Sequence, residues 1–118
     1  MANFWTDAVN EVFRLSADQI RPIAPGRGAC YASDKITVSG ERVGYMYREA
    51  PDFDADSGWR FFSGTETQDF VDNLDNIGIY DVNTLANYDN DIVAHLDAPE
   101  GASFVRDPTS GGFLPDAD

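Results

Sequence analysis

The sequence predicts an α+β domain built on a mainly antiparallel sheet, with about four to six short strands and two to four short helices. Three observations support this fold class. Strand-like runs of apolar and aromatic residues are short and are bounded by Gly, Pro, Asp or Ser. Short helical patterns with capping residues lie between some of these runs. The two kinds of segment do not alternate regularly, as they would in a βαβ protein, so we expect no doubly wound parallel sheet.

The first 28 residues are expected to form a helix and a linker that precede the main domain. Five apolar residues recur at the spacing of one helix face within residues 5–16, and Asp and Glu face the other way. The apolar residues are Trp5, Ala8, Val9, Val12 and Phe13. Prolines and glycines within residues 22–28 then predict a linker. The helix is expected to be a lid on the core or a docking helix.

Residues 29–62 contain several short runs that are typical of β-strands. We predict strands at 29–32 and 59–62, and a β-hairpin whose strands are 36–38 and 43–47. Residues 51–58 are polar and predict a loop. Four aromatic residues at strand spacing are expected to lie in the core: Tyr45, Tyr47, Trp59 and Phe61.

The second half of the domain mixes short helices with strands. Thr65 to Gln68 is a capping box that predicts a helix running to Leu74, and residues 77–82 predict a strand. Asn83 is the predicted cap of one short helix, and Asp89 or Asn90 the cap of the next. Residues 102–106 predict an edge strand. The main domain is therefore expected to span residues 29–106, followed by a loose tail at 107–118.

The negative charge of the chain is regional. Between Glu49 and Glu100 there are 13 acidic residues and one basic residue, Arg60, so this window carries −12 of the net charge of −13. A purely compositional origin, such as a saline habitat, should spread over the whole chain, whereas the first 48 residues carry +1. Such a surface disfavours nucleic acid and anionic membrane as partners, and it favours basic proteins or metal cations.

Composition also indicates the size class of the protein and the cellular compartment in which it is expected. At 118 residues with 42% hydrophobic residues, the chain can bury the core of one ordinary domain. The single cysteine, Cys30, excludes an internal disulfide and fits a reducing compartment. The N-terminal residues lack the pattern of a signal peptide, and no run is long enough to span a membrane. We therefore expect a soluble cytoplasmic protein, and the sequence leaves its oligomeric state open.

Four segments of the chain form a recognisable set: CYASDKITV (30–38), VGYMYRE (43–49), DSGWRFFSG (56–64) and NIGIYDVNTLANYD (76–89). They resemble a bacterial immunity protein family of polymorphic toxin systems, immunity protein family thirty-three, formerly catalogued as a domain of unknown function. The resemblance covers roughly residues 29 to 106. It implies a cytoplasmic protein that binds and neutralises a cognate toxin domain, and it brings no catalytic residue and no cofactor.

The charge and the resemblance together predict a non-enzymatic inhibitor that uses an acidic face to bind a basic toxin domain, such as a nuclease. A nuclease site must attract phosphate, so carboxylates can mimic its substrate. Phe53, in its polar loop, is the predicted apolar anchor. The predicted partner-binding residues are Glu49, Asp52, Phe53, Asp54, Asp56, Asp72, Asp75, Asp89 and Asp91.

Other functions remain open at this stage. One is a small-ligand-binding protein or enzyme with a cleft lined by Tyr45, Tyr47, Trp59 and Asp81, and another is a regulatory domain with no toxin partner. Within residues 52–58, three aspartates have the spacing of a calcium loop, but position 6 is Ser57 and position 12 is Ser63, so we expect no tight calcium site. Cys30 and His95 are each unique, and we expect no catalytic dyad from them.

Overall fold

The computed structural model describes residues 13–116. The helix predicted over residues 5–16 lies mostly outside the described residues, and residues 13–16 are not helical. The first described element is a turn of 3-10 helix, η1 (Ala17–Gln19), which Ser16 caps through a capping box.

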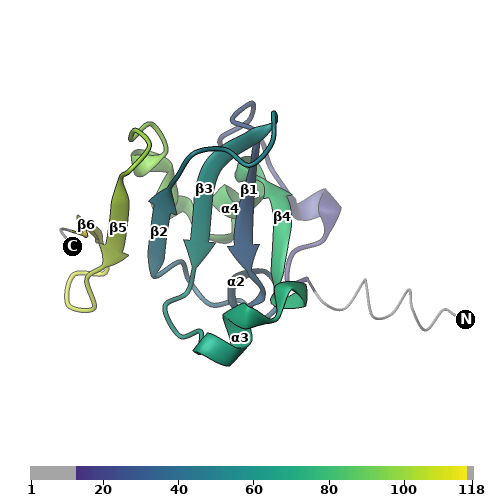
Figure 1. Ribbon diagram of the computed structural model, residues 1–118. Helices are drawn as coiled ribbons and strands as arrows, with labels where there is room; N and C mark the ends of the chain where they lie inside the picture. The colour runs from purple at the N-terminus through teal and green to yellow at the C-terminus, as the bar shows by residue number, and fades with distance from the viewer. Residues whose placement is uncertain (1–12, 117–118) are drawn as a thin grey trace, which may run out of the picture.

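Within residues 13–116, six strands form one sheet in the order β4-β1-β3-β2-β5-β6 (Figure 1). Strands β1 and β3 pair in parallel, and the other neighbouring pairs are antiparallel. The predicted α+β class with a mainly antiparallel sheet is therefore confirmed. The strands are β1 (Ala29–Ser33), β2 (Tyr45–Arg48), β3 (Asp56–Phe62), β4 (Ile77–Asp81), β5 (Ser103–Arg106) and β6 (Phe113–Pro115).

Short helices connect the strands, and most of them begin at a side chain that caps them. The helices after η1 are α2 (Asp34–Thr37), α3 (Gln68–Asp72), η2 (Leu74–Asn76), α4 (Val82–Tyr88) and η3 (Asn90–His95). Asp89 caps η3, as the sequence predicts, but α3 is capped by Thr67 and not by Thr65, the first residue of the predicted capping box. The predicted cap at Asn83 is wrong, because Asp81 accepts the backbone N–H of Asn83 and so caps α4.

The predicted hairpin between residues 36–38 and 43–47 is wrong. The side chain of Ser33 accepts the backbone N–H of Lys35 and starts α2 directly after β1. Ile36 therefore lies in a helix, fully buried. Strand β2 pairs instead with β3 and β5, and residues 36–38 belong to none of the strands of the described chain.

The core lies between the sheet and the helices on one of its faces, here called the covered face. In Figure 1, α4 lies behind the strands. The covered face contributes Cys30, Ala32, Met46, Trp59 and Phe61, and these pack with the helical and loop residues of the core. The latter are Ala24, Ile36, Val43, Val82, Leu85, Ala86, Ile92 and Leu96.

Two of the four predicted core aromatics lie on the other face. Trp59 and Phe61 are buried as predicted, but Tyr45 and Tyr47 are only half-buried. The pairing of β2 with β3 explains the difference, since Met46 is opposite Phe61 whereas Tyr47 is opposite Arg60. Met46 is thus the core residue of β2.

The C-terminal residues add a strand that the sequence analysis does not predict. Residues 113–115 form β6, which pairs with β5, so β5 is not an edge strand. No helix of the described residues has the length and apolar character that crossing a bilayer requires.

Candidate functional site

No helix of residues 13–116 lies on one face of the sheet, and we call it the open face (Figure 1). Beside β1 and β4 two of its aliphatic side chains remain exposed, Leu74 (80%) and Ile79 (59%), while Val105 and Leu114 form a separate exposed pair on β5 and β6 at the other edge of the sheet. Exposed apolar groups clustered on one surface are typical of an interaction site. The strands contribute Tyr31, Tyr45, Tyr47, Arg60, Phe62, Ile77, Ile79, Ser103, Val105 and Leu114 to this face.

Arg60, on the open-face side of β3, is buried although it is charged. Its side chain is 2% exposed and its guanidinium lies 4.1 Å from the ring centre of Tyr31. It donates two parallel hydrogen bonds to Asp56, of 2.8 and 3.0 Å, and a third of 2.7 Å to Glu49. Arg60 is the one basic residue between Glu49 and Glu100, and its charge is balanced by hydrogen bonds to two acids of the same segment.

A bulge at the start of β3 brings Asp56 and Arg60 together. Ala29 and Tyr31 of β1 are two residues apart, yet their partners on β3 are Asp56 and Arg60, four residues apart. Gly58 makes this bend with a φ of +89°, and a Cβ there would lie 2.1 Å from the carbonyl oxygen of Glu49. Only glycine fits such a position, so this residue fixes how the acidic loop leaves the sheet.

The Arg60 cluster changes the acid–base properties of Asp56. Hydrogen bonds from Arg60, supported by backbone N–H groups of Asp52 and Gly58, lower the pKa of Asp56 to about 2 against the opposing effect of burial. Burial alone would lower the pKa of Arg60, but its hydrogen bonds to Asp56 and Glu49 raise it. Both groups therefore stay ionised over the physiological pH range.

The predicted acids of the loop between β2 and β3 fall into two kinds. Glu49, Asp52 and Asp54 are on the loop, with side chains that are exposed or half-exposed. Asp56 is different, because its side chain is fully buried against Arg60 and accepts the backbone N–H of Asp52. We therefore remove Asp56 from the predicted partner-binding residues.

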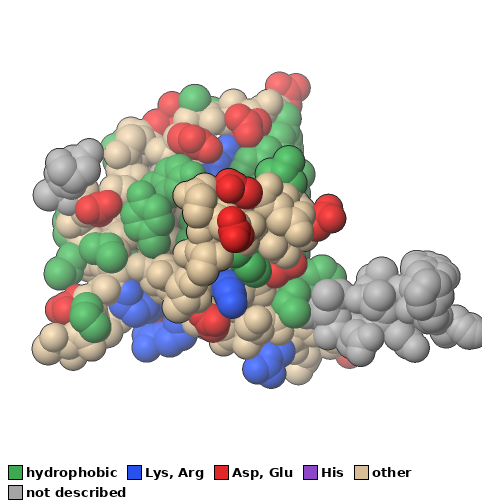
Figure 2. All heavy atoms as spheres, turned by 60° about the horizontal axis from the view of Figure 1, so that its bottom comes forward, with side chains coloured by type: hydrophobic (Ala, Val, Ile, Leu, Met, Phe, Trp, Pro, Cys, Tyr) green, Lys and Arg blue, Asp and Glu red, His purple; other side chains and the backbone are tan. Residues whose placement is uncertain are grey.

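Asp72 and Asp75 lie at the other end of the sheet from this loop. They belong to α3 and η2, which Figure 1 shows below the strands, while the loop 49–55 lies above them. Both side chains are exposed. Figure 2, which brings the lower end forward, shows exposed apolar side chains in patches with acidic side chains between and above them.

Asp89 and Asp91 belong to a second arginine cluster, away from the loop 49–55. Buried Asp89 accepts the backbone N–H of Val43 and an ion pair from Arg106. Asp91 lies 2.9 Å from both Arg106 and Arg42, and these two hydrogen bonds lower the pKa of Asp91. These contacts fasten η3 to β5, so we also remove Asp89 from the predicted surface and treat Asp91 as a structural residue.

Phe53, the predicted anchor, lies at the tip of the acidic loop. It is 39% exposed, and its ring packs edge-on against Tyr31 with 6.4 Å between the ring centres. The hydroxyl of Tyr31 donates a 2.9 Å hydrogen bond to Asp52. The loop is therefore held against the open face, and part of Phe53 remains free for a partner.

The unique cysteine and histidine lie far apart. Cys30 is buried on β1, where burial strongly raises the pKa of its thiol. His95 packs its ring on Phe104 of β5 at 4.5 Å and on Phe113 of β6 at 5.5 Å. Two strands separate β1 from β5, so these two residues do not form a nucleophile–base pair.

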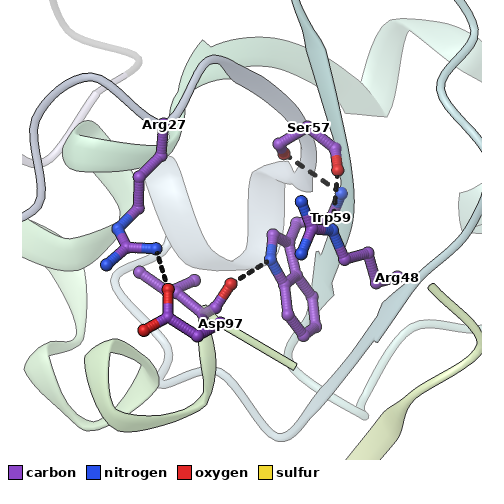
Figure 3. A pocket seen from close by; sticks show the side chains of 6 residues that line it. Arg27, Arg48, Ser57, Trp59 and Asp97 are labelled. Atoms are coloured by element: carbon purple, nitrogen blue, oxygen red, sulfur yellow. Dashed lines mark hydrogen bonds and ion pairs between the residues drawn. The ribbon is translucent and has the colours of Figure 1, made fainter. Parts of the chain in front are cut away.

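A cleft of about 200 Å³ is a second candidate for an active site (Figure 3). Arg27 points at Asp97, 2.7 Å away, and the indole N–H of Trp59 donates to the carbonyl of Leu96. Ser57 donates its hydroxyl to the carbonyl of Ala29. Arg48 donates to the carbonyls of Ser57 and Ala98. These polar groups are already paired, and among residues 13–116 no histidine or carboxylate contacts the hydroxyl of Ser57.

The cleft predicted from Tyr45, Tyr47, Trp59 and Asp81 does not form. Trp59 lies on the covered face, whereas Tyr45 and Tyr47 lie on the open face, and Asp81 is occupied as the cap of α4. Within the described part of the chain, no group of three or more His, Cys, Asp or Glu side chains could hold a metal ion. The loop 52–58 is not arranged as a calcium loop, because Asp56 is turned inward to Arg60.

Most of the chain matches a known protein family. The family model described as "Immunity protein Imm33 domain" matches residues 30–114, which is most of the chain and includes the whole sheet except the first residue of β1 and the last residue of β6. No curated protein and no solved structure matches significantly.

Proposed function

Because this match places the chain in the Imm33 family of immunity proteins, we propose that it binds and neutralises a cognate toxin domain. The observation that carries the proposal beyond the family is the open face, which pairs exposed apolar side chains with an acidic loop. An interface of this kind joins apolar contacts in its centre to charged groups at its rim.

The partner is proposed to be a basic domain of a polymorphic toxin, such as a nuclease. Nuclease sites are positively charged because they attract phosphate. Glu49, Asp52 and Asp54 could meet the same cations in place of phosphate, with charge-assisted hydrogen bonds fixing the register. The regional charge would raise the association rate above the ~10⁵ to 10⁶ M⁻¹s⁻¹ of uncharged pairs.

Inhibition is proposed to be stoichiometric binding without an enzymatic step. The buried thiol of Cys30, the aromatic packing of His95 and the paired groups of the cleft in Figure 3 support this, since none of them is arranged for catalysis. We place the protein in the cytoplasm, where a nuclease toxin would act and where a free cysteine is kept reduced.

The test is titration of the toxin domain encoded beside this protein's gene. Residual toxin activity should fall linearly to zero at a fixed molar ratio, and the two proteins should co-purify. A protein that modified the toxin enzymatically would instead inactivate many equivalents of toxin per molecule. Absence of any complex, with the toxin fully active at an excess of this protein, would refute the proposal and favour a ligand-binding or regulatory domain.

A further inference from the structure

An apolar hollow of about 390 Å³ lies on the open face, over β1 and β4. It is lined by Tyr31, Asp52, Leu74, Ile77 and Ile79. Leu74 is 80% exposed and Ile79 is 59% exposed. Leaving large aliphatic side chains in water forgoes the burial that stabilises a folded chain, so a concave group of them indicates a contact that forms on binding.

The hollow lies between the two groups of exposed acids. Asp52 forms part of its lining on the side of the loop 49–55, and Leu74 comes from η2, whose next residue is the exposed Asp75. Arg60 is the basic residue of β3 beside Tyr31, which lines the hollow. Its charge is buried and is neutralised by Asp56 and Glu49. An apolar centre with carboxylates on both sides is complementary to an apolar side chain flanked by cations.

We propose that the hollow receives an aliphatic or aromatic side chain of the toxin domain, presented between basic residues that contact Asp52 and Asp75. This inference rests on the proposed function and names the anchor point of that interface. It moves the anchor from Phe53, whose ring is partly committed to Tyr31, to the hollow beside it. A second copy of this chain is disfavoured as the occupant, because each copy carries a net charge of −13.

The hollow and the loop should act on different rate constants. Exposed carboxylates attract a basic partner over a distance, so they govern association. An apolar side chain seated in a hollow must leave it for the complex to come apart, so its contacts govern dissociation. The experiment therefore measures the association and dissociation rate constants separately.

The experiment compares two pairs of apolar truncations in the full chain, with the neighbouring toxin domain as the probe. Leu74→Ala with Ile79→Ala opens the hollow. Val105→Ala with Leu114→Ala is the matched control, because it removes exposed aliphatic groups from β5 and β6 of the same face. We expect the first pair to speed dissociation at least about tenfold with little change in association, and the control to change both by less than about twofold.

The outcomes separate this inference from the proposed function. If wild type binds and both pairs dissociate at the wild-type rate, the anchor is elsewhere and the inference is overturned while the function stands. If wild type does not bind, both fail. Thermal unfolding of the free variants is the second measurement. A loss as large as that of a core truncation would mean that this chain's own residues fill the hollow, which would also overturn the inference.

Sedimentation of the free protein addresses a second copy as the occupant. We expect a monomer for wild type and for both pairs of variants. A wild-type dimer that the Leu74 and Ile79 truncations dissociate would show that the hollow joins two copies of this chain, and the inference would be wrong.

Discussion

The two faces of the sheet use similar residues for different purposes. Phe61 and Phe62 are neighbours on β3, yet Phe61 is fully buried under the helices, whereas Phe62 stacks on Tyr47 on the open face and stays partly exposed. The covered face is closed by α4 and η3. The open face is closed by nothing in the described residues. The covered face therefore holds the fold together, and the open face is the one that we propose for a partner.

The largest expected effect is on stability, and it compares substitutions at two adjacent residues that lie on opposite faces of the sheet. Phe61→Ala should lower the free energy of unfolding by about 3–5 kcal/mol, because it leaves a cavity in the core. Phe62→Ala should cost only about 1 kcal/mol, since its ring is already partly in water. Urea unfolding monitored by circular dichroism checks both. Equal losses would mean that the open face is as much a structural core as the covered one.

The buried ion pair between Arg60 and Asp56 is expected to stabilise the fold although it lies on the open face. Asp56→Asn keeps the shape of the side chain but leaves Arg60 without its main countercharge, so we expect a loss of about 3 kcal/mol. Asp54→Asn, on the exposed part of the same loop, is the control and should change stability by less than about 0.5 kcal/mol. If the two substitutions cost the same, the Arg60 cluster does not hold the loop.

The same cluster should appear in the pH dependence of stability. The folded pKa of Asp56, about 2, lies below the ordinary value of about 3.9 that it has when unfolded. Its contribution of about 2 kcal/mol is therefore present in full above about pH 5 and is lost as the pH falls through about 2. Unfolding measured from pH 6 to pH 2 should show the gap between wild type and Asp56→Asn narrowing by that amount. A constant gap would contradict the assignment.

A smaller effect is expected from the exposed acids on association. Asp52→Lys with Asp54→Lys should slow binding of the toxin domain roughly tenfold at low salt and flatten its salt dependence, because these charges act within a screening length of ~8 Å at physiological salt. Asp18→Lys with Asp97→Lys reverses two exposed acids of η1 and of the cleft in Figure 3 and is the control. Stopped-flow rates over a salt series decide between them. Equal slowing would mean that net charge, and not the loop, steers the partner.

The fold was predictable from the sequence where the signals are local. Strand β4 and the cap at Asp89 follow from short-range patterns, and the structure confirms them. The hairpin at residues 36–38 failed because the capping side chain of Ser33 outweighs the β-propensity of Ile36 and Val38. Strand β6 was missed because it is short and contains Pro115, which suits only an edge strand.

The candidate site was less predictable, because it depends on contacts between distant residues. The sequence places Asp56 and Asp89 among the other acids, and nothing local indicates that Arg60 and Arg106 bury them. The alternation on β2 gives two faces but not which one is covered, so Tyr47 was assigned to the core in place of Met46. Gly58 was the one local signal of the Arg60 cluster, since a glycine after Asp56 and Ser57 at the start of a strand indicates a bulge.

We propose that the toxin domain binds at the acid-flanked hollow of the open face. A methyl NMR titration of the isotope-labelled chain with the unlabelled toxin domain tests this contact directly, using aliphatic methyl groups on both faces. We predict intermolecular contacts and large shift changes at Leu74, Ile77 and Ile79, with the methyl groups of Ile36, Leu85 and Ile92 in the core little affected. A complex whose intermolecular contacts fall on α4 and η3, with the methyl groups of the hollow unchanged, would contradict the account.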